Sequence, residues 1–278
     1  MRVLIHRLFA LLLALSIAAC GGNSGTFPAA VTSPSSAISN AAPFMRGTVS
    51  DTAFHDIGGA TIQILNGPSA GLTTISDATG QWSFSAVLDD ATQFRATKEG
   101  YEPAVQPLGA YCANCNPHRW VNFSLKAIAA PVNVAGVYAM TINVDRACTN
   151  FPEQMRTRSY AVTLPSSANA YFDLSPTEAK FVPGWDWFQG GVSGNSIGFW
   201  FETLVEEVAP GNYFLVGVSA SGILRAEHPA TITTVADGRI SYCSVDPVSG
   251  TFDECLRGRT ASVTTCDSPQ HTIVLTPR

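Results

Sequence analysis

The pattern that comes closest to catalytic machinery is the pentapeptide Gly-Asn-Ser-Ile-Gly at residues 194–198. A serine between two glycines is the nucleophile of many hydrolases, where it stands on a sharp turn from a strand into a helix. Here the residues on both sides alternate between apolar and polar, which is typical of strands. His228 and His271 follow, but no α/β pattern would bring them to Ser196. The pentapeptide therefore predicts a β-hairpin, with its first glycine and its asparagine as the two-residue turn, and no catalytic residue.

Counting outward from this turn separates the hairpin into two faces. One face is apolar and is predicted to join the core: Phe188, Val192, Ile197, Phe199 and Phe201. The other face is predicted to point outward with aromatic, amide and carboxylate side chains: Trp185, Trp187, Gln189, Trp200, Glu202 and Glu206. Flat rings beside hydrogen-bonding groups are suited to stacking on a sugar. The alternative is that these rings pack on the first domain or on a loop, because large aromatic side chains are usually buried at an interface.

A second candidate for chemistry is Cys-Ala-Asn-Cys-Asn-Pro-His, which begins at Cys112. Attachment of a c-type haem needs histidine directly after the second cysteine, where Asn116 stands. Zinc would find three ligands, Cys112, Cys115 and His118, and no fourth nearby. A redox dithiol belongs to a βαβ context that the sequence lacks. The motif therefore predicts a Cys112–Cys115 disulfide that staples a loop, with no metal and no cofactor.

The start of the chain has the pattern of an export signal. Arg2 and Arg7 precede the apolar run Leu8–Ala19, which is too short to span a bilayer as a helix. The run ends in Ile-Ala-Ala-Cys, with the cysteine at position 20. This resembles the lipobox of bacterial lipoproteins. The resemblance implies a signal peptide at 1–19, acylation of Cys20 with chains such as palmitate, and, with Gly21 next, an outer-membrane address in the cell envelope.

Residues 20–43 are rich in Ser, Ala, Gly and Pro and carry no charged side chain. Such a segment buries too little surface to offset its ordering entropy, so it is predicted to be a flexible tether from the lipid. The whole chain has 16 Lys and Arg against 21 Asp and Glu. Because nucleic acid binding needs clustered basic residues, that partner class is not predicted. The predicted partners are the membrane, through the anchor, and a glycan or an envelope protein.

The remaining cysteines fit an exported protein. Of seven cysteines, setting Cys20 aside leaves six, which predicts three disulfides in an oxidising compartment. Cys243 and Cys255 are predicted to face each other across a hairpin whose turn includes Gly250. Cys148 and Cys266 are then predicted to join the end of one strand to the start of the last.

Residues 44–127 consist of short alternating runs separated by turn residues, which predicts strands. The runs "RGTVSD", "GGATIQI", "TTISDATGQWSFSAV" and "KEGYEP" resemble the carboxypeptidase regulatory-like domain. The resemblance implies a seven-stranded, transthyretin-like β-sandwich, grouped with carbohydrate-binding-like folds. It implies no activity, and the chain has no His-Glu-x-x-His motif for the zinc site of the namesake peptidase.

Residues 128–133 are predicted to be a linker, and residues 134–278 a second all-β domain. About eight alternating runs predict an antiparallel β-barrel or sandwich, and the run at 196–206 is expected to be a single strand. The opening Gly-Val-Tyr resembles the Gly-x-Trp start of lipocalins, with Tyr138 in the tryptophan position. The chain as a whole is thus predicted to be all-β.

These observations predict a non-catalytic lipoprotein of the cell envelope that acts as a binding or scaffold module, with carbohydrate as the candidate ligand. The alternative is an envelope enzyme, a hydrolase or a thiol redox protein, whose site the motifs do not reveal. No motif completes a catalytic constellation, and this favours the binding module.

The lipid anchor gives a first prediction. The variant Cys20→Ala should move from the membrane fraction to the soluble fraction of cells, because it has no thiol to acylate. Each CH₂ group of an acyl chain that is buried in the bilayer adds about 0.8 kcal/mol to the free energy of membrane binding. The tether variant Ser24→Ala is the matched control and should stay with the membrane. Complete membrane partitioning of Cys20→Ala would show that no lipid is attached there.

Overall fold

The computed structural model describes residues 44–278, apart from 109–118, 167, 225–230, 247–251 and 258–261. Strands account for nearly all of its regular structure, so the all-β class predicted from the sequence is confirmed. Short helical elements are limited, within the described residues, to η1 (Glu153–Met155) and α1 (Phe252–Arg257). None of the described helices is long and apolar enough to cross a membrane.

The N-terminal β region is a sandwich of two four-stranded sheets. The first sheet contains β4 (Gln81–Ser85), β1 (Phe44–Asp51), β7 (Arg119–Trp120) and β8 (Phe123–Leu125). The second has the order β3 (Thr73–Ile75), β2 (Thr61–Ile64), β5 (Gln93–Thr97) and β6 (Ala104–Pro107). Their alternate side chains meet in one core that includes Met45, Trp82, Phe84, Phe94 and Phe123.

Two details of this sandwich differ from the sequence-based expectation. Strand β6 was not anticipated, because its residues are mostly exposed and lack an apolar alternation. The alternating run Trp-Val-Asn-Phe-Ser-Leu-Lys at 120–126 predicts one strand, but it is divided into β7 and β8. Between them the side-chain oxygen of Asn122 accepts hydrogen bonds from the backbone nitrogen and the hydroxyl of Thr48.

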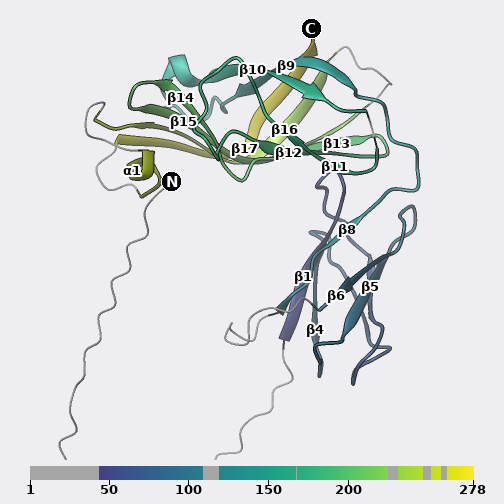
Figure 1. The fold of residues 1–278 in the computed structure, drawn as a ribbon. Coiled ribbons are helices and arrows are strands. Elements are labelled where there is room, and N and C mark those ends of the chain that lie inside the picture. Colours follow the sequence, from purple (N-terminus) through teal and green to yellow (C-terminus); the bar gives the residue numbers. More distant parts are fainter. Residues whose placement is uncertain (1–43, 109–118, 167, 225–230, 247–251, 258–261) are drawn as a thin grey trace, which may run out of the picture. The chain divides into compact units, whose positions relative to one another are not determined.

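The C-terminal β region is a nine-stranded antiparallel sheet that curls on itself (Figure 1). Its order is β10 (Thr157–Leu164), β9 (Gly136–Asn143), β17 (Ser262–Pro277), β16 (Ile232–Ser244), β15 (Asn212–Ile223), β13 (Ser196–Trp200), β12 (Phe188–Ser193) and β11 (Tyr171–Leu174). The ninth strand, β14 (Leu204–Ala209), pairs with one end of β15. A bridge between Ala161 and Thr177 joins β10 to the segment after β11, so the two ends of the order approach each other.

The inner face of this curled sheet holds the larger of the cores. Phe188 and Phe201 stack with ring centroids 4.2 Å apart, and Phe199 meets Phe188 edge-on at 6.1 Å. These three rings and Phe214 are at most 2% exposed. Burying a side chain of this size contributes roughly 1.5–3 kcal/mol, so this face of the hairpin is fixed by packing.

Two disulfides tie the C-terminal region together. The sulfur atoms of Cys148 and Cys266 lie 1.99 Å apart, and those of Cys243 and Cys255 lie 2.02 Å apart. Both pairs are those that the spacing predicts, but the geometry around Cys255 differs. It lies on helix α1 and not on a strand opposite Cys243, whose cross-strand partner is Val263. The motif with Cys112, Cys115 and His118 lies outside the described residues.

The sequence placed Glu206 on the outward face, and this is wrong. The run at 196–206 is interrupted at residues 201–203, and the strand that restarts as β14 has its even-numbered side chains pointing inward. Glu206 is 3% exposed and is hydrogen-bonded and ion-paired to Arg158. It also accepts a hydrogen bond of 2.9 Å from the hydroxyl of Tyr160. Burial raises the pKa of Tyr160 well above its usual value, which keeps this hydroxyl a donor.

His271 is fully buried near the Cys148–Cys266 disulfide. Its Nδ1 accepts a hydrogen bond of 3.0 Å from the backbone nitrogen of Asp145, which requires an unprotonated Nδ1. Burial is the largest influence on this imidazole and lowers the pKa of His271 below 6.5. The fold therefore holds the ring in its neutral form.

This gives a pH prediction. Below about pH 6.5, His271 is protonated in the unfolded chain but stays neutral in the folded chain, because folding lowers its pKa. The free energy of unfolding should therefore fall as the pH decreases from 7 to 5. In His271→Asn the amide oxygen can still accept from Asp145, and no titration remains. Denaturant unfolding across this range should show a smaller pH dependence in the variant. An equal change of unfolding free energy with pH in both proteins would show that His271 is not held neutral by the fold.

Candidate functional site

The hairpin of β12 and β13 has the register that its sequence predicts. Gln189 pairs with Trp200, Val192 with Ile197 and Ser193 with Ser196, and Gly194 adopts a positive φ of 55° in the turn. Ser196 is 9% exposed, and within the described residues no hydrogen bond or ion pair joins it to a histidine or a carboxylate. The outer face of this hairpin is a surface with two halves, one near the turn and one away from it.

The half of the outer face nearest the turn is covered by the loop after β1. The backbone oxygens of Thr52 and Ala53 lie so close to Gly191 and Gly198 that a Cβ at these glycines would be 1.8 and 1.9 Å from them. The hydroxyl of Thr52 also donates to the carbonyl of Val192 at 2.5 Å. Only glycine permits backbone to approach a sheet surface this closely. In this half, the outer face packs on a loop, as the alternative to sugar binding predicts.

The docked loop is shaped by its own hydrogen bonds. Asp51 is 3% exposed, and its carboxylate accepts from the backbone nitrogens of Ala53 at 2.7 Å and His55 at 3.0 Å. Burial alone would raise the pKa of Asp51, but these hydrogen bonds and the nearby His55 ring outweigh it and lower the pKa. From the sheet side, the hydroxyl of Tyr171 donates to the carbonyl of Asp51 at 3.1 Å. The ring of Phe54 lies 4.9 Å from that of Tyr171.

The half of the outer face away from the turn is open. Trp187 is 40% exposed and Trp200 is 39% exposed, although both stand next to fully packed phenylalanines in the chain. Between them Gln189 donates to the carboxylate of Asp173 across a separation of 3.4 Å. Glu202 is also exposed. Two indoles, an amide and carboxylates thus occupy one surface whose backbone is fixed by the sheet.

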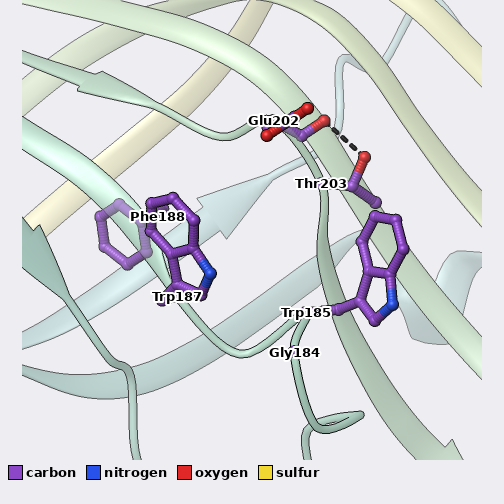
Figure 2. Close-up of a pocket in the computed structure, with 6 residues that line it drawn as sticks. All are labelled: Gly184, Trp185, Trp187, Phe188, Glu202 and Thr203. Atoms are coloured by element: carbon purple, nitrogen blue, oxygen red, sulfur yellow. Dashed lines mark hydrogen bonds between the residues drawn. The ribbon is translucent and has the colours of Figure 1, made fainter.

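A small hollow of about 160 Å³ lies beside this open half. Figure 2 shows the indoles of Trp185 and Trp187 on two sides of it, with Glu202 and Thr203 along a third. The sequence predicted Trp185 on the exposed face, but the structure does not place it there. Its ring packs edge-on against Phe252 of α1 at 5.9 Å and belongs to a small cluster around the Cys243–Cys255 disulfide. Trp185 therefore has two roles: it forms one wall of the hollow, and it packs in the cluster around the disulfide.

A second, larger hollow of about 560 Å³ begins at the same two residues, Glu202 and Thr203. It extends over the outer side of β15, β16 and β17 and is bounded by α1, with a lining of Leu215, Gly217, Gly238, Arg239, Ser241, Cys243, Cys255, Leu256, Val263, Thr265 and Asp267. Sequence reasoning missed this region, because each of its residues looks like an ordinary outward position of a strand. The missed signal was the break between β13 and β14, which opens space around Glu202.

The charged groups of the larger hollow are partly neutralised in place. The guanidinium of Arg239 hydrogen-bonds to the carboxylate of Asp267 at 2.8 Å, and this contact raises the pKa of Arg239. Since both side chains are exposed, the pair contributes little to stability. Across the part of the chain that the structure describes, no group of histidine, cysteine and carboxylate side chains is arranged to hold a metal.

Comparisons with known proteins add little to this geometry. No protein-family model matches the chain, and no curated protein matches it. The resemblance to the carboxypeptidase regulatory-like domain therefore stays a prediction. One solved structure that is similar is that of a "putative membrane-associated protein of unknown function" from Bacteroides fragilis NCTC 9343. It has 10% sequence identity and a TM-score of 0.23, and the match covers 84% of this chain and 97% of that one. A TM-score this low carries no argument about the present chain.

The docked half of the face yields a prediction. In Gly198→Ala the new methyl group would meet the carbonyl of Ala53, so the variant should lose about 1–3 kcal/mol of stability and exchange amide hydrogens faster in the loop after β1. Gly217→Ala is the control, because its methyl group would lie 3.4 Å from its nearest neighbour, at ordinary contact distance. Equal unfolding free energies for the two variants would mean that the loop does not press on the hairpin.

Proposed function

We propose that this chain is a non-catalytic, lipid-anchored binding protein of the cell envelope whose C-terminal sheet binds carbohydrate on the open half of its outer face. The observation that carries the proposal is the exposure of Trp187, directly before β12, and of Trp200 in β13, 40% and 39%, in a hairpin whose opposite face is fully packed. Exposed large aromatic side chains gathered on one rigid surface commonly mark a binding site.

The chemistry of the open half matches a sugar ring. Each indole offers a flat apolar surface to the C–H side of a pyranose, and such contacts need little reordering because the strands already hold the side chains. Gln189 donates one amide hydrogen to Asp173, which leaves its second donor and its carbonyl oxygen for a sugar, while the carboxylate of Glu202 accepts from sugar hydroxyls. The site is shallow, which favours weak and reversible binding.

Presentation at a membrane completes the proposal. Cys20 would carry the lipid, residues 20–43 would form the tether, and Gly21 favours the outer membrane. The two β regions would then stand away from the bilayer with the open face available to envelope glycans. An envelope enzyme, whether hydrolase or thiol redox protein, stays the alternative, but no observation on the described residues favours it. The four described cysteines are all joined in disulfides.

Substitution of the exposed indoles tests the proposal. Trp187→Ala and Trp200→Ala should abolish binding to immobilised glucose and N-acetylglucosamine oligomers with little change in melting temperature, since neither ring belongs to a core. For the unaltered protein we expect a Kd around 10⁻⁴ M, which corresponds to only about −5.5 kcal/mol. Ser196→Ala, on the covered half, is the control and should bind normally. Absence of any glycan binding, with a clear drop in melting temperature for the tryptophan variants, would leave a structural lipoprotein instead.

A further inference from the structure

The larger hollow has the dimensions of a binding site in its own right. Its volume of about 560 Å³ lies in the range of roughly 300–1,000 Å³ that is typical of ligand pockets, whereas the tryptophan hollow, at about 160 Å³, lies below it. The two share Glu202 and Thr203 and are therefore adjacent. A ligand seated on Trp187 would reach the larger hollow without leaving the protein surface.

The floor of the larger hollow is a sheet surface that mixes polar and apolar side chains. Gly217 of β15, Ser241 of β16 and Thr265 of β17 line it, and Ser241 is paired directly with Thr265. Gly217 contributes no side chain, and the carbonyl of Glu202 lies next to it. The hydroxyl groups offer hydrogen bonds, and Leu215 and Val263 of the same lining offer apolar contact. Spread over three strands, this combination suits the hydroxyl and C–H sides of an extended sugar chain.

The walls of the larger hollow are held by covalent and aromatic contacts. Helix α1 stands at its edge with Leu256, and the Cys243–Cys255 disulfide fixes the helix to β16. Phe252 of the same helix packs on Tyr213 at 5.3 Å and on Trp185 at 5.9 Å. Because Trp185 also lines the tryptophan hollow, one packed unit shapes both spaces.

The charges of the combined lining select against anionic ligands. Among the lining residues that the structure describes, Glu202 and Asp267 supply two carboxylates, and the one cation, Arg239, is already engaged by Asp267. A polyanion would meet the negative charge of Glu202, where the two hollows join. An uncharged chain with many hydroxyl or amide groups meets no such repulsion.

We propose that the two hollows form one continuous groove for an extended, uncharged glycan chain, with one sugar on Trp187 and the following sugars on the β15–β17 floor beside helix α1. The inference rests on the proposed function and adds the class of ligand, an oligosaccharide of several units and not a single sugar. Affinity then depends on ligand length, because each additional unit on the floor adds contacts.

Calorimetric titration of the full chain with N-acetylglucosamine oligomers of one to six units tests the groove. Affinity should rise at least tenfold between the short and the long oligomers, and oligogalacturonates of equal length should bind at least tenfold more weakly. Thr265→Trp, which fills the floor, should bind long oligomers no better than short ones and keep the affinity for short ones. Thr276→Trp, on an exposed part of the same strand outside the lining, is the control and should behave as the unaltered protein.

The outcomes separate the groove from the proposed function. Binding that does not depend on length, or a Thr265→Trp variant with an unchanged length series, overturns the groove and leaves tryptophan-based sugar binding in place. Equal affinity for the anionic oligomers overturns the charge argument and with it the assignment of an uncharged ligand. Failure of the unaltered chain to bind any of these oligomers overturns both proposals. The length series on the unaltered chain needs no variant, so it decides even if Thr265→Trp does not fold.

Discussion

The close approach of two carbonyl oxygens to two glycines determines how the outer face of the C-terminal sheet is used. The carbonyls of Thr52 and Ala53 rest on Gly191 and Gly198, in space where any side chain would stand. This contact is possible because the hairpin places both glycines on the same face, directly opposite each other. It covers the turn end of the face and leaves Trp187 and Trp200 at the other end exposed.

The same hairpin connects the packing of the inner face to the chemistry of the outer one. Phe188, Phe199 and Phe201 lock the strands from inside, and a strand so locked presents its outward indoles in fixed positions. The break at residues 201–203 then divides the acidic residues between the faces. Glu202 remains outside at the hollow, while Glu206 turns inward to Arg158 and Tyr160. Glu206 is nearly fully buried and both of its carboxylate oxygens are engaged by these two residues, so it serves the fold and not a ligand.

Much of this architecture could be predicted from local pattern. Alternation predicted the hairpin register around Gly194, and cysteine spacing predicted the pairs Cys148–Cys266 and Cys243–Cys255. These features depend on residues near each other in a strand or on covalent geometry. Helix α1 was missed because its six residues, Phe252–Arg257, are too few to show a helical period. The helix is held instead by a disulfide and by contacts with Trp185 and Tyr213.

The candidate site was harder to predict, because it depends on contacts between distant segments. Gly191 and Gly198 are covered by a loop that is distant in the sequence. Thr52 of this loop, for example, is 140 residues away from Val192, its hydrogen-bond partner. The inward turn of Glu206 depends on where β13 ends and β14 begins. The larger hollow depends on helix α1 lying over β16. None of these arrangements leaves a periodic signal, so the sequence alone placed Trp185 and Glu206 on the exposed face.

The central claim is that the outer face has one covered half and one half open to a ligand, and hydroxyl-radical footprinting read by mass spectrometry tests it most directly. In the free protein, Trp187 and Trp200 should be oxidised at rates near that of Trp120, which is 50% exposed, and much faster than Trp82, which is 3% exposed. Addition of an N-acetylglucosamine hexamer should protect Trp187 and Trp200 and leave Trp120 unchanged. Oxidation of Trp187 and Trp200 as slow as that of Trp82 in the free protein would contradict the account, because the indoles would then be packed and not available.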